Sequence, residues 1–397
     1  MKKIKVGVIG LGCRGSSLLK HILMQMDTIE VTAVCDEYYD RVQKGVEIVK
    51  NACEKTVYGT TDATELIYRN DVEAVFIFSS WESHIPLAIE CMKASKPVGV
   101  EVGGAYSVEQ CWNVVHTYEQ TKTPIMLLEN CCYGRRELMV LNMVRKGLLG
   151  QIVHCEGGYC HDLRDEVAGG AKNRHYRLRN YISRNCENYP THELGPIAKI
   201  LNINHGNRFM TLTSVASKAA GLYEYVRENM PDDKTLADVK FSQGDIVTTV
   251  ITCAGGETIK LTLDTTLPRY YSRQFTVRGT KGMYEEVTDS VYLDGDGKHF
   301  KWKEEWGNAE KYEKEYEHPV WKEYLQSGVY GSHEGIDWLI MNDFINCIIE
   351  NKPFEIDVYD MASWMCVTAL SEQSIALGGA AVAFPDFTNG KWQLNKI

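Results

Sequence analysis

Long apolar runs and an excess of positive charge are both missing from this sequence. No apolar run approaches the roughly 20 residues that a membrane-spanning helix needs, so we expect no membrane span. The chain has 43 lysines and arginines against 53 acidic residues, and its net charge of −10 argues against nucleic acid or an anionic membrane as partner. Internal repeats and low-complexity linkers are also missing.

The cysteines lack the pattern of a disulfide framework. There are 13, an odd number, and none forms a CxxC pair. The first expected strand follows directly after MKK, which leaves no room for a signal peptide, so we expect reduced thiols and a cytoplasmic location. A possible metal cluster comprises Cys131, Cys132, His154, Cys155, Cys160 and His161. Strand alternation would place Cys155 and Cys160 on opposite faces, so we expect no metal there.

What the sequence does contain begins with a glycine motif. Residues 4–9 are mostly β-branched, as in a buried strand, and Gly10-Leu11-Gly12-Cys13-Arg14-Gly15 follows at once. A helical pattern over 16–26 and a strand over 30–35 then lead to Asp36, 21 positions after Gly15. Strand, turn, helix, strand and acid in this order favour a dinucleotide-binding motif over a glycine-rich turn that binds nothing.

Each part of the motif has a physical role. Gly10 permits the tight turn, Gly12 lets the backbone approach a pyrophosphate, and Gly15 lets helix and strand pack closely. The phosphates would lie at the helix N-terminus, where unpaired N–H groups and the helix dipole favour negative charge. Asp36 would accept hydrogen bonds from a ribose 2′-hydroxyl and repel a 2′-phosphate. The motif therefore predicts NAD as the cofactor, rather than NADP.

Three further strand ends are expected to face the cofactor, because ligands of open α/β sheets bind at the carboxyl ends of the strands. An apolar strand over 74–78 leads into a predicted loop, Ser79-Ser80-Trp81-Glu82-Ser83-His84, before a helix over 85–94. The strands over 96–100 and 124–128 lead into Glu101-Val102-Gly103 and Glu129-Asn130. His84 has an alternative interpretation, as a helix N-terminal residue that binds no ligand.

Beyond residue 130 the pattern changes to successive strands. They are expected over 152–161, 209–217, 246–253, 258–267 and 273–279, with final helices over 332–351 and 359–377. We predict an α/β protein with an N-terminal Rossmann domain, a doubly wound parallel sheet, over 1–128, and a C-terminal α+β domain with a mostly antiparallel sheet over 129–397. The open face of such a sheet often binds a second subunit, so we expect a homo-oligomer, a dimer or tetramer. Segment 294–318 shows no apolar period and is interpreted as solvated surface.

Residues 174–196, RHYRLRNYISRNCENYPTHELGP, look least like scaffolding. They hold four arginines, three tyrosines and two histidines, which suit a polyhydroxylated or anionic small molecule. Tyr189 and His192 are three positions apart across a helix start and can project into one space. A second polar cluster with Tyr159 and His161 could meet them. The alternative is a surface loop.

These motifs carry a family resemblance. The first 130 residues resemble the Gfo/Idh/MocA oxidoreductase superfamily, which joins a Rossmann domain to an α/β sheet domain. EGGYCHDLR, YPTH followed by LGP, and LPRYYS with GTKG around Tyr271 are similar to glycoside hydrolase family 109, whose type activity is an NAD-dependent α-N-acetylgalactosaminidase. The sequence departs from that family's usual pattern at Glu193, where glycine is common, and at Gly103, where proline is common.

The resemblance implies two sets of binding residues. The dinucleotide would contact Cys13, Arg14, Asp36, Trp81, Glu82, Ser83, His84, Glu101, Val102 and Asn130. It would also contact Gly10, Gly12 and Gly15 of the glycine motif, and Ser79 after the strand over 74–78. A sugar would contact Tyr159, Arg177, Tyr189, Pro190, Thr191, His192 and Tyr271.

The resemblance also implies a redox-neutral hydrolysis, in which C3 of the sugar is oxidised, C2 loses a proton, the C1 group is eliminated, water adds and C3 is reduced again. Candidates for the acid–base roles are Tyr159, His161, Glu129, Tyr189 and His192, with the last two expected nearest the chemistry. One alternative is an NAD-dependent sugar dehydrogenase, but Val102 stands where such enzymes typically carry a catalytic lysine. The other is a non-catalytic NAD or sugar sensor.

Overall fold

The computed structural model describes residues 3–236, 238–295, 305–331 and 333–394, which form two compact units. The first unit comprises Met1–Tyr133 and Ser327–Ala362, and the second comprises Gly134–Gln326 and Ser363–Ile397. Segment Ser327–Ala362, expected in the domain over 129–397, therefore belongs to the first unit. The reason is visible in its packing, because the Phe344 ring lies 5.0 Å from the Phe76 ring of the first unit's sheet.

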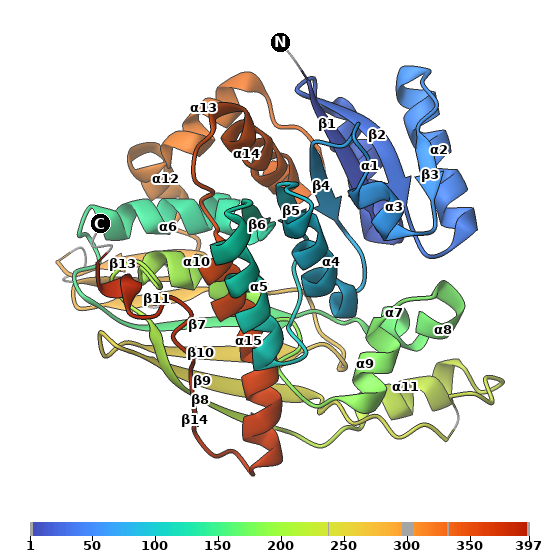
Figure 1. Cartoon of the computed structure of the whole chain (residues 1–397). Helices are drawn as coiled ribbons and strands as arrows, with labels where there is room; N and C mark the ends of the chain where they lie inside the picture. Colours follow the sequence, from blue (N-terminus) through green and yellow to red (C-terminus); the bar gives the residue numbers. More distant parts are fainter. Residues whose placement is uncertain (1–2, 237, 296–304, 332, 395–397) are drawn as a thin grey trace. The chain divides into compact units, whose positions relative to one another are not determined.

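Within the described residues, the sheet of the first unit has six parallel strands in the order β3-β2-β1-β4-β5-β6 (Figure 1). The strands are β1 (Ile4–Ile9), β2 (Ile29–Cys35), β3 (Tyr58–Thr60), β4 (Ala74–Ile77), β5 (Val98–Val100) and β6 (Ile125–Leu127). The strand order reverses between β1 and β4, and ligands of doubly wound sheets bind at this switch point. The predicted parallel sheet is confirmed.

The helices of the first unit are α1 (Cys13–His21), α2 (Tyr39–Cys53), α3 (Ala63–Ile67), α4 (Trp81–Lys93), α5 (Val108–Thr121), α14 (Ile336–Glu350) and the start of α15 (Val358–Ala376). Predicted helix boundaries were wrong at α1, at α4 and at α14, which begins at Ile336 although the helix was expected over 332–351. α1 ends at His21 and a 3₁₀ turn, Leu23–Gln25, completes the expected helical stretch. α4 begins at Trp81, so the predicted loop over 79–84 consists only of Ser79 and Ser80. Proline favours the first turn of a helix, and Pro86 lies further inside this one.

The described part of the second unit contains an eight-stranded sheet in the order β13-β12-β11-β7-β10-β9-β8-β14. Its strands are β7 (Ile152–Cys160), β8 (Phe209–Ala216), β9 (Ile246–Cys253), β10 (Thr258–Asp264), β11 (Thr276–Gly279), β12 (Gly282–Glu285), β13 (Ser290–Leu293) and β14 (Val382–Ala383). Only β7 and β10 pair in parallel among these strands, which confirms a mostly antiparallel sheet.

The two faces of this sheet differ. Along β10, Ile259, Leu261 and Leu263 are fully buried and the intervening residues are half-buried. Lys260 on the half-buried face pairs with Glu156 of β7 at 2.8 Å. This is the face expected to bind a second copy, and the oligomeric state stays a prediction.

The helices of the second unit lie between and after its strands. They are α6 (Arg135–Arg145), α7 (Arg164–Ala168), α8 (Gly170–Asn173), α9 (Arg177–Ser183), α10 (Thr191–Ile200), α11 (Gly221–Asn229), α12 (Glu310–Tyr316), most of α13 (Pro319–Ser327) and the later part of α15. Among all described helices, none combines the length and apolar character that crossing a membrane requires.

The interpretation of 294–318 as solvated surface was wrong in part. Residues 296–304 lie outside the described residues, whereas the rest contains α12. Arg135 Nε donates to the buried Glu317 at 2.9 Å, and Ala309 is fully buried. Ion pairs, rather than a stripe of apolar side chains, hold this segment in place. Its sequence therefore shows no apolar period, although the segment contains a helix.

Candidate functional site

The glycine loop after β1 leaves no room for side chains at two positions. Gly10 has a φ of +95°, and a Cβ there would lie 2.5 Å from the carbonyl carbon of Phe78. A Cβ on Gly15 would lie 2.0 Å from the carbonyl oxygen of Gly10. Gly12 differs, because a Cβ there would meet only Arg41 Nη1, at 3.7 Å. The backbone is therefore open at Gly12, where a dinucleotide pyrophosphate would approach, and the loop fits NAD.

Asp36 is held at the end of β2 by backbone donors. Its two carboxylate oxygens accept the N–H groups of Leu11, at 2.7 Å, and Tyr38, at 3.0 Å. A carboxylate has about four lone-pair sites, so acceptor capacity for a ribose hydroxyl remains. Arg41 Nη1 lies 3.8 Å from Asp36 Oδ1, which places a cation next to the acid.

Asp36→Ala is expected to weaken NAD binding by about tenfold, the scale of one lost hydrogen bond to a charged group, and to narrow the preference for NAD over NADP. The second effect follows because Arg41 would then face a 2′-phosphate without the neighbouring carboxylate. Titration calorimetry with both cofactors measures it, and the exposed neighbour Glu37→Ala serves as the control. An unchanged preference would mean that Asp36 does not contact the ribose.

The residues after β4 are partly engaged within the protein. The His84 ring is buried, its Nε2 lies 2.9 Å from the Ser79 carbonyl, and burial lowers the pKa of His84 to about 4. The Ser79 and Ser83 hydroxyls share a hydrogen bond of 2.7 Å, and Glu82 follows Trp81 in the first turn of α4. These contacts agree with the alternative interpretation of His84, in which a neutral ring forms a hydrogen bond within the protein and stabilises the turn.

Trp81 explains one departure from the family pattern. Its indole is buried, and a Cβ on Gly103 would lie 2.5 Å from Trp81 Cδ1. A proline at position 103 could not be accommodated with the indole in this position. Glycine after Glu101-Val102 is therefore linked to tryptophan at the start of α4.

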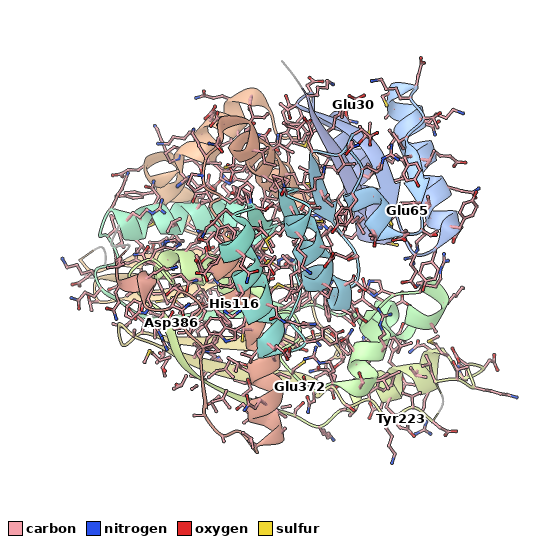
Figure 2. The ribbon with its side chains drawn as sticks, viewed as in Figure 1. Glu30, Glu65, His116, Tyr223, Glu372 and Asp386 are labelled. Atoms are coloured by element: carbon pink, nitrogen blue, oxygen red, sulfur yellow. The ribbon has the colours of Figure 1, made fainter. Side chains whose placement is uncertain are left out.

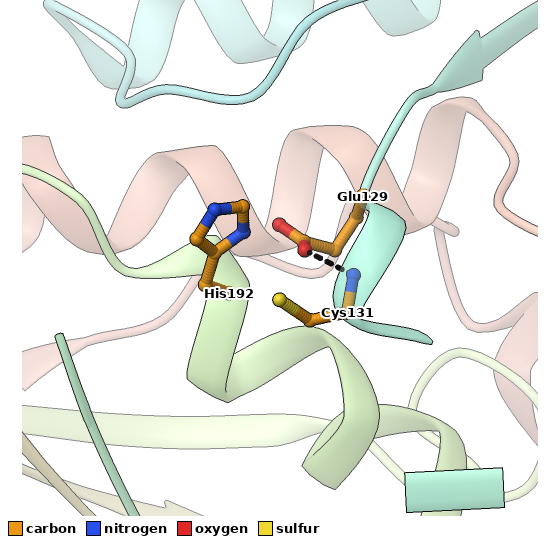
Figure 3. Close-up of side chains that lie close together, drawn as sticks. All are labelled: Glu129, Cys131 and His192. Carbon is orange, nitrogen blue, oxygen red and sulfur yellow. Dashed lines mark hydrogen bonds between the residues drawn. The ribbon is translucent and has the colours of Figure 1, made fainter. Parts of the chain in front are cut away.

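Two carboxylates and one amide at the strand ends are buried. Glu101 Oε1 accepts the N–H of Val102 at 3.0 Å, and Glu129 Oε1 accepts the N–H of Cys131 at 3.0 Å (Figure 3). Glu129 is fully buried, and Asn130 donates to Asp337 at 2.7 Å. Sequence reasoning missed Asp337, since no local pattern connects it to the glycine motif more than 300 positions earlier; Arg14, in that motif, also donates to it.

In the second unit the predicted sugar residues come together from separate segments. Tyr159 of β7 lies against Tyr189, with ring centroids 4.4 Å apart, and 5.8 Å from the His192 ring. Tyr189 Oη and His192 Nε2 are 3.3 Å apart. His192 lies in the first turn of α10 (Figure 3). The predicted proximity of Tyr189 and His192 is present in the structure.

The cluster continues toward solvent through His161 and Tyr271. Tyr159 Oη lies 3.3 Å from His161 Nδ1, and the His161 ring lies 5.2 Å from Tyr271, which is 51% exposed. Burial raises the pKa of Tyr159. Burial, and then the charge of Arg177, lower the pKa of His161. Near neutral pH the cluster therefore combines a protonated phenol with a neutral imidazole.

Arg177 supplies a buried cation beside these rings. Its Cζ lies 5.0 Å from the centroid of Tyr189 and 6.0 Å from that of Tyr159, and its Nε lies 2.8 Å from Glu166 Oε1. Burial alone would lower the pKa of Arg177, but the charges of the surrounding tyrosines and Glu166 hold it well above its usual range. Sequence reasoning missed Glu166, which no motif marks.

The loop that presents Tyr189 is tied to the later part of α15. Arg184 Nη2 lies 2.6 Å from Glu372 Oε2, and the N–H of Glu187 donates to Ser371 Oγ at 2.8 Å. Figure 2 labels Glu372 on α15. Pro190 directly precedes α10, and Thr191 is fully buried at its start. Thr191 is thus buried at the helix start and lies outside the ring cluster that Tyr189 and His192 form.

Glu193 has a structural counterpart on β7. It is buried, and a Cβ on Gly157 would lie 2.6 Å from Glu193 Cβ. The glycine at position 157 makes room for the glutamate that replaces the family's usual glycine after YPTH.

Comparison with known proteins divides the chain in the same way as its motifs. Residues 4–128 match the oxidoreductase family with an NAD-binding Rossmann fold, and residues 133–394 match the C-terminal domain of glycosyl hydrolase 109. An α-N-acetylgalactosaminidase of Tannerella forsythia is 37% identical over 412 residues, covering 98% of this chain and 87% of that protein. One of Shewanella oneidensis is 38% identical over 402 residues, with coverages of 99% and 87%.

Solved structures share the fold. A levoglucosan dehydrogenase, in complex with NADH and levoglucosan, superposes with a TM-score of 0.72 at 17% identity, covering 97% of this chain and all of that one. At this identity the likeness concerns the fold alone.

Proposed function

Because the chain belongs to glycoside hydrolase family 109 and its N-terminal part is an NAD-binding Rossmann domain, we propose that it is an NAD-dependent glycosidase acting on α-N-acetylgalactosaminides. The observation that carries the proposal is the cluster of Tyr159, Tyr189 and His192, in which a phenol and an imidazole lie 3.3 Å apart. A phenol next to an imidazole suits proton transfer at the sugar hydroxyl that is oxidised, on C3, and at the neighbouring carbon, C2.

NAD, when bound, supplies a reversible acceptor for hydride and so allows hydrolysis without net oxidation. The residues of the chain supply the proton transfers. His192, next to the Tyr189 hydroxyl, is placed to accept a proton, and the neutral His161 can do the same. Tyr159, whose pKa burial raises, remains a donor. The Arg177 cation stabilises negative charge on a sugar oxygen as the C2 proton leaves.

The substrate class follows from the ring surfaces and from the relatives. Tyr271 is half exposed and offers an aromatic face, which suits the apolar side of a sugar ring. Two relatives that match this chain over 98% and 99% of its length are α-N-acetylgalactosaminidases, which favours N-acetylgalactosamine at this site. The alternative, a sugar dehydrogenase, would need a base in place of the lysine that Val102 replaces. Val102 is buried and cannot transfer a proton.

The test is hydrolysis of a nitrophenyl α-N-acetylgalactosaminide in D₂O with NAD present. We expect cleavage without accumulation of NADH, and deuterium at C2 of the released sugar, because the C2 proton passes through a base that exchanges with solvent. The matched control is the β-linked glycoside. Cleavage without C2 exchange would indicate ordinary displacement, and stoichiometric NADH with a keto-sugar would establish the dehydrogenase.

A further inference from the structure

Asp337 is a buried carboxylate with donors from three separate segments of the first unit. It lies in the first turn of α14 and is fully buried. Arg14 approaches both oxygens, with Nη1 2.8 Å from Oδ2 and Nη2 2.7 Å from Oδ1. Asn130 Nδ2 donates at 2.7 Å and His333 Nδ1 lies at 2.9 Å. Segment Ser327–Ala362 thus reaches the glycine loop and the end of β6 through one carboxylate.

Arg14 connects this carboxylate to a further strand end. Its Nε donates to Glu101 Oε2 at 3.1 Å, so one guanidinium joins the residue after β5 to α14. A bidentate contact between arginine and carboxylate fixes both side chains more tightly than a single contact. Burial alone would raise the pKa of Asp337, but hydrogen bonds from Arg14 and His333 hold it well below its usual range. The network is therefore charged at neutral pH.

The turn before α14 is held in an unusual conformation. His333, Glu334 and Gly335 have φ values of 52°, 55° and 87°, so two residues with side chains occupy the left-handed region. Such conformations cost free energy and persist only where their surroundings determine them. The contact of His333 with Asp337 is one such determinant, although the His333 side chain is 61% exposed.

We propose that Asp337 is a positioning residue for the cofactor loop, and that Asp337, Arg14, Asn130 and His333 form a clasp that keeps NAD bound through repeated turnovers. A redox-neutral glycosidase gains nothing from releasing its cofactor, since the cofactor ends each cycle as it began. The reason for retaining NAD rests on the proposed function, whereas the NAD affinity measured below does not depend on the sugar chemistry.

The first experiment measures NAD affinity directly, by titration calorimetry on protein stripped of nucleotide. Asp337→Asn is expected to raise the Kd for NAD by roughly 10–100-fold, as expected for the loss of charged hydrogen bonds, and to release NAD during gel filtration. The matched control is Asp343→Asn on the same helix. Asp343 accepts the Tyr133 hydroxyl at 2.6 Å, in the same unit. It should retain the wild-type Kd.

Equal Kd values for Asp337→Asn and the wild type would overturn the clasp, as would equal losses in both variants, which would indicate a general effect of loosening α14. Failure of the stripped wild type to bind NAD would overturn both the cofactor assignment and the clasp. A second measurement needs no variant. Hydrogen exchange of the wild type should slow on NAD addition in residues 333–340 as well as in the glycine loop, and unchanged exchange in 333–340 would contradict the coupling.

Discussion

Replacing His192 by alanine is expected to lower the turnover of a nitrophenyl α-N-acetylgalactosaminide by about 10²–10⁴-fold, the range that positioned acid–base groups contribute. The imidazole Nε2 lies 3.3 Å from the Tyr189 hydroxyl, so the variant loses both a base and the partner of that phenol. Bound NAD should be retained, since the residues expected to hold it belong to the other unit. Stopped assays with absorbance at 400 nm (roughly the nitrophenolate band) measure the loss, and nucleotide released on denaturation measures retention.

Tyr189→Phe tests whether the pair acts as one group. The variant keeps the ring that packs 4.4 Å from Tyr159 but lacks the hydroxyl, so folding should be preserved while turnover falls. The double variant should lose little more than His192→Ala alone, because residues that act as a unit are not additive. His205→Ala, a histidine in the same unit outside the cluster, should keep wild-type turnover. Wild-type rates in His192→Ala and Tyr189→Phe would place the chemistry elsewhere.

The sequence predicted the parts of the molecule whose constraints are local. Gly10 has a φ of +95°, which favours glycine, and a Cβ added to Gly15 would lie 2.0 Å from a backbone oxygen. Both positions therefore require glycine, and the glycine pattern in the sequence predicted the loop. Tyr189 and His192 are likewise joined by a spacing of three residues at a helix start. Alternating apolar residues in strands such as β10 predicted the second sheet for the same reason.

Residues whose partners are distant in the chain could not be predicted. Arg14 and Asp337 are 323 positions apart, and nothing near either residue indicates the other. The placement of segment Ser327–Ala362 in the first unit could not be predicted for the same reason, since an apolar helix can cover either sheet. Arg184 and Glu372 are 188 positions apart. Each of these pairs depends on the completed fold.

The second large expected effect is on stability, and it concerns Glu187, a buried acid two positions before Tyr189. Glu187 is fully buried, and burial raises its pKa from 4.5 to about 8, opposed in part by a hydrogen bond from the Tyr189 backbone. At neutral pH the carboxyl is therefore protonated in the folded protein and ionised in the unfolded chain. Glutamine is neutral at every pH and has nearly the same shape. Glu187→Gln is expected to stabilise the protein, by an amount that grows with pH.

The sign follows from the proton balance. Below the unfolded pKa of 4.5, both states carry the proton and pH has no effect through this group. Between 4.5 and about 8 the unfolded chain releases its proton while the folded protein retains it, so the wild type loses stability as pH rises. Above the folded pKa of about 8, both states are ionised, and the wild type loses no further stability through this group. The shift corresponds to a difference on the order of 3–5 kcal/mol between wild type and variant at pH 9 (roughly a unit above the folded pKa), and to almost none at pH 4.

Denaturant unfolding of both proteins at several pH values, compared as a difference in free energy of unfolding, removes the contribution of groups that titrate identically in the two proteins. Glu372→Gln is the matched control. It removes a carboxylate that holds the same loop through Arg184 at 2.6 Å, so it should lower stability where Glu187→Gln raises it. A difference between wild type and Glu187→Gln that stays constant from pH 4 to pH 9 (about the span between the two protonation limits) would mean that Glu187 does not titrate with a raised pKa.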